Sequence, residues 1–179
     1  SAVQYIPEVA KVASQLTVFQ RSANWIMPRD QQIFTQEELD EFEANPETFF
    51  ASRNHIHKMR EDGFDRTQQG TDSQKEGVRI ALEFLERNID DSELRKKLVP
   101  DYEFGCKRIL RTDEYYPALN RENVSLITDG ISEITENAVI TTSGDVIEAD
   151  IIIYGTGFAS QNFNGDLDII GHAGSSLSK

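Results

Sequence analysis

An amphipathic helical segment at the start of the chain leads directly into a short run of β-forming residues. Over residues 1–14 the apolar side chains recur at helical spacing, at Val3, Ile6, Val9, Ala10 and Ala13. Residues 16–20, LTVFQ, have the length and composition of a strand. A helix followed at once by a strand is half of a β-α-β unit, so we expect an α/β fold whose first strand lies before residue 1.

Residues 22–29 are expected to form a loop, and a block of helical patterns then separates the first strand from the later ones. Thr35, followed three residues later by a glutamate, has the form of a capping box and predicts the start of an acidic, solvated helix. Residues 77–87 carry the apolar stripe of a second helix, and Asp90 is expected to cap a third. Residues 51–72 are polar and have no clear assignment. We interpret residues 36–99 as a helical insertion in an α/β domain.

From residue 124 onward the pattern changes from helical to β. Strands are predicted at residues 124–128, 131–135, 138–142, 146–149 and 150–154. The last of them is apolar at four successive positions, which is typical of a strand buried on both faces of a parallel sheet. The order is therefore a short β meander, a buried strand and a glycine-rich turn.

Composition and residue spacing disfavour several classes of function. The net charge is −13 and no basic run opposes it, which disfavours nucleic-acid binding. No apolar stretch approaches the length of a membrane span, and the first residues do not have the pattern of a signal peptide. His55 and His57 are two residues apart and so face different sides of a helix, and no metal site is predicted.

The single cysteine, Cys106, excludes an internal disulfide framework and a cysteine-based zinc cluster. We expect it to be a small, half-buried apolar residue. Taken with the composition, this fits a cytoplasmic protein.

Arg21 directly follows the first predicted strand. In a dinucleotide-binding fold, an acidic residue at this place hydrogen-bonds the ribose 2′-hydroxyl, whereas an arginine accepts a 2′-phosphate. The position therefore favours NADP over NAD. An ordinary surface arginine is the alternative.

Two further stretches carry residues suited to ligand binding. Lys107 and Arg108 are adjacent cations in an acidic protein. A guanidinium can stabilise an oxyanion and a lysine adds charge to a phosphate site, while a solvated loop is the alternative. Gly155 and Gly157 follow the last predicted strand, where they either let backbone approach a ligand closely or form a tight turn.

Four motifs in the same order resemble the class B flavin monooxygenases, the Baeyer–Villiger group in particular. Residues 1–4, SAVQ, are similar to the end of that family's glycine-rich nucleotide loop, and residues 18–29, VFQRSANWIMPR, to its strand and arginine loop. Residues 98–110, LVPDYEFGCKRIL, with 115–124, YYPALNRENV, resemble its most specific block. Residues 149–158, ADIIIYGTGF, resemble its Asp-x4-Ala-Thr-Gly-Phe motif with a glycine in place of the usual alanine.

The resemblance implies a role for each matching residue. Arg21 would grip the 2′-phosphate of NADP with Lys107 assisting. Arg108 would be the catalytic arginine near the flavin, holding NADP and stabilising negative charge. The other cofactor-binding positions would be Ser1, Ala2, Gln4 and Ser22, and, at the crossing toward the FAD domain, Gly155, Thr156 and Gly157.

The resemblance also implies the cofactors and the fold. The family uses NADP(H) and FAD: it reduces FAD with NADPH and inserts one atom of O₂ into a ketone or oxidises a soft heteroatom. The implied fold is α/β, a partial Rossmann-like FAD/NAD(P)-binding fold with its first strand missing, a helical insertion and a β meander. Residues 1–35 and 100–154 would form the NADP-binding part, 36–99 the insertion and 155–179 the crossing toward the FAD domain.

The chain departs from the family in the motifs that it lacks. The leading glycines of the nucleotide loop would lie before residue 1, and the FAD-binding glycine motif is absent from the 179 residues. We therefore expect the chain alone to be inactive and an exposed sheet edge to favour a homodimer. The alternatives are an N- or S-oxidising relative, against which the Lys107–Arg108 pair argues, and an interaction module without catalysis.

Overall fold

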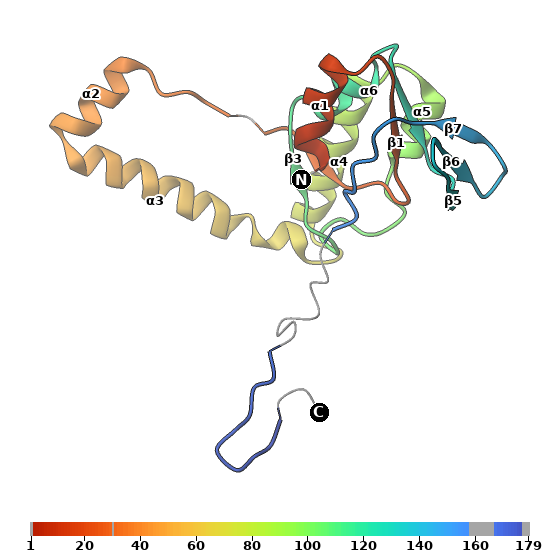
Figure 1. Ribbon diagram of the computed structural model, residues 1–179. Coiled ribbons are helices and arrows are strands. Elements are labelled where there is room, and N and C mark those ends of the chain that lie inside the picture. Colours follow the sequence, from red (N-terminus) through yellow and green to blue (C-terminus); the bar gives the residue numbers. More distant parts are fainter. Residues whose placement is uncertain (1, 30, 158–166, 177–179) are drawn as a thin grey trace.

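A parallel pair of strands lies within the body of the protein. The computed structural model describes residues 2–29, 31–157 and 167–176. Strand β1 (Leu16–Phe19) pairs in parallel with β4 (Val124–Ile127) over four residue pairs, although most of the chain separates them (Figure 1). Parallel strands with intervening helices confirm the α/β class expected from the sequence.

Helix α1 (Ala2–Val12) and helix α6 (Tyr115–Leu119) contact each other, and α6 also contacts β4. The buried face of α1 follows the predicted apolar stripe: Val3, Ile6, Pro7 and Ala10. Helix α6 was not predicted. It is only five residues long and four of these are buried, so it shows too little of the helical period to be recognised.

The core joins residues that precede and follow the helical block with residues of the block itself. Helices α4 (Asp72–Asn88) and α5 (Ser92–Leu98) supply buried side chains to the same cluster as α1, β1 and β4. The cluster comprises Val3, Ile6, Val18, Ile26, Phe84, Leu85, Ile89, Leu98, Tyr115, Tyr116, Leu119 and Leu126. The division of the chain at residues 35, 99 and 154 stays a prediction.

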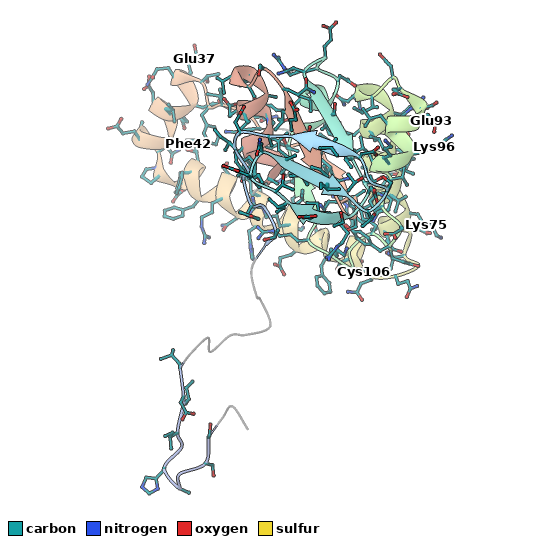
Figure 2. All side chains as sticks on the ribbon, turned by 45° about the vertical axis from the view of Figure 1, so that its right-hand side comes forward. Glu37, Phe42, Lys75, Glu93, Lys96 and Cys106 are labelled. Atoms are coloured by element: carbon teal, nitrogen blue, oxygen red, sulfur yellow. The ribbon has the colours of Figure 1, made fainter. Side chains whose placement is uncertain are left out.

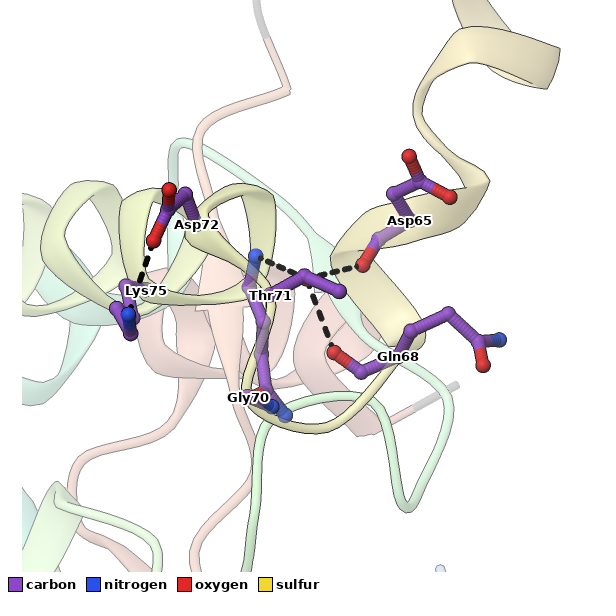
Figure 3. Close-up of polar contacts among 7 residues, drawn as sticks. Asp65, Gln68, Gly70, Thr71, Asp72 and Lys75 are labelled. Atoms are coloured by element: carbon purple, nitrogen blue, oxygen red, sulfur yellow. Dashed lines mark hydrogen bonds and ion pairs between the residues drawn. The ribbon is translucent and has the colours of Figure 1, made fainter.

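Helix α4 begins five residues earlier than the apolar stripe predicted, because Thr71 caps it (Figure 3). The Thr71 hydroxyl accepts a hydrogen bond from the backbone N–H of Gln74 at 3.1 Å. It also lies 2.7 Å from the carbonyl oxygen of Asp65 and 3.0 Å from that of Gln68. A threonine hydroxyl at this position satisfies one of the free N–H groups of the first turn.

Two further local predictions were wrong. The cap of α5 is Asp91 rather than Asp90, because the Asp91 carboxylate accepts from the N–H of Glu93 at 2.8 Å. Residues 22–29 were expected to be a loop but contain β2 (Ile26–Met27), which pairs in parallel with β3 (Leu110–Arg111). A strand of two residues is too short to leave an alternating pattern.

Helices α2 (Gln36–Ala44) and α3 (Pro46–Asp62) form an arm that projects from the body (Figure 1). The predicted capping box at Thr35 is confirmed, and α3 with the 3₁₀ turn η1 (Phe64–Thr67) occupies most of the stretch that had no assignment. Every residue of both helices is at least partly exposed. No group of side chains in the described residues could hold a metal ion.

A three-stranded antiparallel meander follows β4. It consists of β5 (Ile131–Ile134), β6 (Ala138–Thr141) and β7 (Val146–Glu148), which pair in sequence order as predicted. The Asp129 carboxylate ties the segment before β5 to the β6–β7 turn, since it accepts from the N–H of Ser143 at 2.9 Å and from its hydroxyl at 2.7 Å.

The last predicted strand is not formed. In the described part of the chain, residues 151–154 join no sheet, and the exposed fractions of Ile151 and Tyr154 are 80% and 72%. The four apolar residues do favour a strand, but a strand needs a neighbour whose backbone groups complete its hydrogen bonds. The residues described here provide none beside this segment, so the prediction of a strand buried on both faces was wrong.

Cys106 lies at the protein surface (Figure 2), so its expected half-burial was also wrong. Cys106 lies in a tight turn, in which its backbone N–H donates to the carbonyl oxygen of Glu103 at 3.1 Å. None of the described helices combines the length and the apolar character needed to cross a membrane.

Candidate functional site

Arg21 lies where the β1–β4 ladder ends. The backbone N–H of Gln20 donates to the carbonyl oxygen of Ile127 at 2.9 Å, and Arg21 follows with its side chain exposed. The Gln20 side chain is fixed from the other side, because the Tyr115 hydroxyl donates to its Oε1 at 3.0 Å. The strand and the buried tyrosine thus fix the backbone from which Arg21 projects.

Lys107 reaches the same loop from a distant part of the chain. Its Nζ lies 3.5 Å from the Oγ of Ser22, the residue after Arg21. The same Nζ lies 4.1 Å from the centre of the Tyr102 ring, in a cation–π contact. The structure therefore brings the predicted residues Ser22 and Lys107 together.

Gly105 makes the turn that carries Lys107. Its φ of 96° lies in the left-handed region that favours glycine. A Cβ at this position would lie 2.8 Å from the Cα of Thr67, so the loop runs tightly against η1. Any other residue here would move the backbone that leads to Lys107.

Packed aromatic side chains support the loop that carries Lys107. The indole Nε1 of Trp25 donates to the carbonyl oxygen of Tyr102 at 2.9 Å, and the Trp25 and Phe104 rings meet edge to face at 5.4 Å. Phe104 is 2% exposed and lies over Gly77 of α4, where a Cβ would come within 2.7 Å of the ring. These contacts therefore hold the loop of residues 22–25 against the loop of residues 102–107.

The charges at this site have no ion-pair partner among the described residues. Arg21, Lys107 and Arg108 are all exposed, and none of them is in an ion pair in the part of the chain that the structure describes. Uncompensated cations in a protein of net charge −13 favour binding of an anion. Burial raises the pKa of the Tyr102 phenol, so the ring beside Lys107 is neutral at physiological pH.

A second pair of predicted positions meets at the start of α1. A Cβ on Gly155 would lie 2.4 Å from the Tyr5 hydroxyl and 3.7 Å from the Cβ of Ala2. The turn at Gly155, Thr156 and Gly157 is thus beside the first turn of α1, where free N–H groups favour an anion. Gly157 has a φ of 90°.

Two predicted cofactor-binding positions lie at the start of the chain. Gln4 is exposed on α1, and Ser1 lies outside the described residues. Among the described residues, no hydrogen bond or ion pair joins the Ser22–Lys107 pair to the Ala2–Gly155 pair, and no hydrogen bond involves the side chain of Arg21 or Arg108. Sequence reasoning missed Tyr102 and Trp25; the only signal for them was an aromatic residue close to each basic position.

The arm carries a separate apolar depression of about 250 Å³. Three phenylalanine rings line it in successive edge-to-face contacts, and Arg53 contributes a charged side chain to its lining. Its lining residues are Phe34, Phe42, Phe49, Ser52, Arg53 and Ile56. None of the predicted site residues is among them.

Several known proteins are similar to this chain, although no protein-family profile matches it. A Baeyer–Villiger monooxygenase of Pseudomonas aeruginosa is 35% identical over 165 residues, covering 90% of this chain and 31% of that protein. One of Streptomyces coelicolor is 35% identical over 158 residues, covering 88% of this chain and 30% of that protein. The chain thus spans about a third of the length of these curated relatives.

Solved structures show the same similarity. The complex of OTEMO with FAD and NADP superimposes with a TM-score of 0.78 at 26% identity, covering 98% of this chain and 39% of that one. Oxidized steroid monooxygenase bound to NADP has a TM-score of 0.80 at 24% identity, covering 99% and 41%, and shows a shared fold.

Proposed function

We propose that this chain forms the NADP-binding part of an FAD- and NADPH-dependent monooxygenase. The proposal is supported by its homology to the Baeyer–Villiger monooxygenases over about a third of their length. The proposed reaction of the whole protein inserts one atom of O₂ into a ketone or a soft heteroatom of an organic substrate. FAD, when bound, supplies the oxygen chemistry, and its site lies largely outside this chain.

The observation that carries the proposal is the meeting of Lys107 with Ser22 directly after β1. Their side chains lie 3.5 Å apart, next to the exposed Arg21. In a dinucleotide fold the residues that follow the second strand meet the adenosine ribose, and cations there accept a 2′-phosphate. Arg21 would provide the planar, permanently charged group, Lys107 a second charge and Ser22 a hydroxyl donor.

The first turn of α1 and the Gly155–Gly157 turn are proposed to receive the pyrophosphate part of NADP. The N–H groups of a helix start attract phosphate, and the glycines leave the backbone open to close approach. The contact of Gly155 with Tyr5 and Ala2 supports this, because it brings the two segments to the same place. In the whole protein, we propose that residues 151–154 form a strand of the sheet and so place the Gly155–Gly157 segment at its edge.

Arg108 is proposed to act at the other end of the dinucleotide, where the nicotinamide meets the flavin. A guanidinium remains protonated at every pH of interest, so it can hold NADP and stabilise negative charge in a site closed to water. Its side chain is exposed and without an ion pair in the described residues, which leaves it available for both roles.

Titration of the chain with NADP⁺ and NAD⁺ tests the proposal. We expect tighter binding of NADP⁺, and we expect Arg21→Ala to remove that preference while leaving NAD⁺ binding unchanged. Arg87→Ala, an exposed arginine on α4, is the matched control and should keep the preference. Equal affinities in the unmodified chain, or a preference that survives in Arg21→Ala, would contradict the assignment.

A further inference from the structure

The Tyr102 ring lies against the ammonium of Lys107, with 4.1 Å between Nζ and the ring centre. We propose that Tyr102 is a positioning residue that holds Lys107 beside Ser22 and thereby strengthens the preference for a dinucleotide with a 2′-phosphate. This inference rests on the proposed function and adds to it a residue that acts through Lys107.

Lysine needs such support more than arginine does. Its ammonium is a strongly hydrated point charge on a flexible stem of four carbons, and an exposed lysine samples many rotamers. The face of an aromatic ring attracts the ammonium and restricts those rotamers. A lysine that is already ordered loses less conformational freedom when it binds a phosphate, so the affinity for that phosphate rises.

Tyr102 is itself held in place through its backbone and its hydroxyl. Trp25 Nε1 donates to its backbone carbonyl at 2.9 Å, and its own hydroxyl donates to Oδ1 of Asn24 at 3.5 Å. The buried ring of Phe104 fixes the backbone two residues later. Asn24 and Trp25 belong to the loop of Arg21 and Ser22, so the ring that orients Lys107 is fastened to the loop toward which Lys107 points.

One acidic side chain of this loop, Glu103, is engaged elsewhere. Glu103 accepts from the side-chain amide of Gln69 at 3.0 Å and from that of Gln74 at 3.3 Å. Its charge is therefore directed toward the start of α4. Lys107 contacts an aromatic ring, which does not neutralise the ammonium charge. The positive charge of Lys107 therefore remains available to an anion.

Binding measurements on ring variants test the inference. Tyr102→Leu removes the aromatic face, and we expect the affinity of the chain for NADP⁺ to fall by about two- to fivefold, as for an exposed cation–π contact, with NAD⁺ unaffected. Tyr102→Phe keeps the face and loses only the hydroxyl, so its NADP⁺ affinity should stay close to that of the unmodified chain. Circular dichroism establishes that both variants are folded.

A second measurement follows Lys107 without any ligand. In NMR spectra of lysine-labelled protein, the ring should shift the Lys107 ε-methylene signals upfield in the unmodified chain and in Tyr102→Phe, but not in Tyr102→Leu. Absence of this shift overturns the positioning role. So does an NADP⁺ affinity that is unchanged in Tyr102→Leu but lowered in Lys107→Ala.

The two proposals can fail separately. If the shift is present but the chain does not prefer NADP⁺, or Lys107→Ala does not alter NADP⁺ binding, then the proposed function is refuted, and the specificity role of Tyr102 with it. If NADP⁺ is preferred and Lys107 is required, but Tyr102 has no effect, only the further inference is refuted.

Discussion

The indole nitrogen of Trp25 and the carbonyl oxygen of Tyr102 are 2.9 Å apart and joined by a hydrogen bond across 77 positions of sequence. This bond fastens the loop after β1 to the loop that carries Lys107. The relative position of the proposed phosphate-binding residues therefore depends on a partly buried contact between Trp25 and Tyr102.

Replacing Trp25 by phenylalanine removes this donor and keeps an aromatic ring. Trp25 is 7% exposed, so the Tyr102 carbonyl loses a partner that water does not readily replace. We expect the free energy of unfolding to fall by about 1–3 kcal/mol, measured by urea denaturation. Tyr102→Phe, which leaves that carbonyl bond intact, is the control; equal losses in the two variants would show that the bond is not the cause.

Gly77→Ala is expected to destabilise the protein although alanine favours a helix more than glycine does. The gain in helix propensity is about 1 kcal/mol, but the new Cβ would lie 2.7 Å from the buried Phe104 ring. We expect a net loss of about 1–3 kcal/mol in urea denaturation. Adding Phe104→Leu should recover part of it, and a stabilised Gly77→Ala variant would contradict the packing described for Phe104.

Lowering the pH should destabilise the meander, because the Asp129 carboxylate becomes protonated. Hydrogen bonds from the Thr142 hydroxyl, and then from the hydroxyl and N–H of Ser143, lower the pKa of the Asp129 carboxyl below its usual range. A lowered folded pKa gives stability that is complete above the unfolded pKa of about 3.9 and is lost as the pH falls toward the folded value.

The measurement is the melting temperature between pH 2 and 7. Below about pH 4 the decrease should be smaller in Asp129→Asn than in the unmodified protein, because the substituted group does not titrate. Asp150→Asn, an exposed carboxylate outside the network, is the control. Parallel curves for the unmodified protein and Asp129→Asn would exclude this role.

Residues 151–154 are expected to drive self-association. They are apolar, exposed and without strand partners in the described residues, and such segments pair with other chains. We expect light scattering to detect a dimer that weakens in Ile151→Lys. Val146→Lys, at a 64% exposed position on β7, should leave the association unchanged. A monomer at all concentrations would contradict the expectation.

Local sequence signals predicted the elements whose formation depends on residues that are close together in the chain. The stripe of α1, the capping box of Thr35 and the short strands of the meander all depend on neighbours within a few residues, and the structure has them. The segment 151–154 has an equally strong pattern, but its state depends on a partner strand that local sequence does not contain. Its exposure shows where a propensity fails without tertiary support.

The candidate site was predictable only in part. Arg21, Lys107 and Arg108 stand out because they are cations at particular places in an acidic chain. The roles of Trp25, Tyr102 and Gly105 come from contacts between loops and from one backbone angle, and no residue pattern encodes those distances. The relation between Arg21 and Arg108 across one dinucleotide stays a prediction.

The arm of α2 and α3 shares no buried residue with the body, so little of its stability is coupled to the core. Helix α2 is held by its capping box, and phenylalanine rings pack between α2 and α3. Opening of such a unit requires far less free energy than global unfolding, so we expect its amides to exchange with solvent before those of β1 and β4. The arm should therefore unfold and refold locally while the core of the protein stays folded.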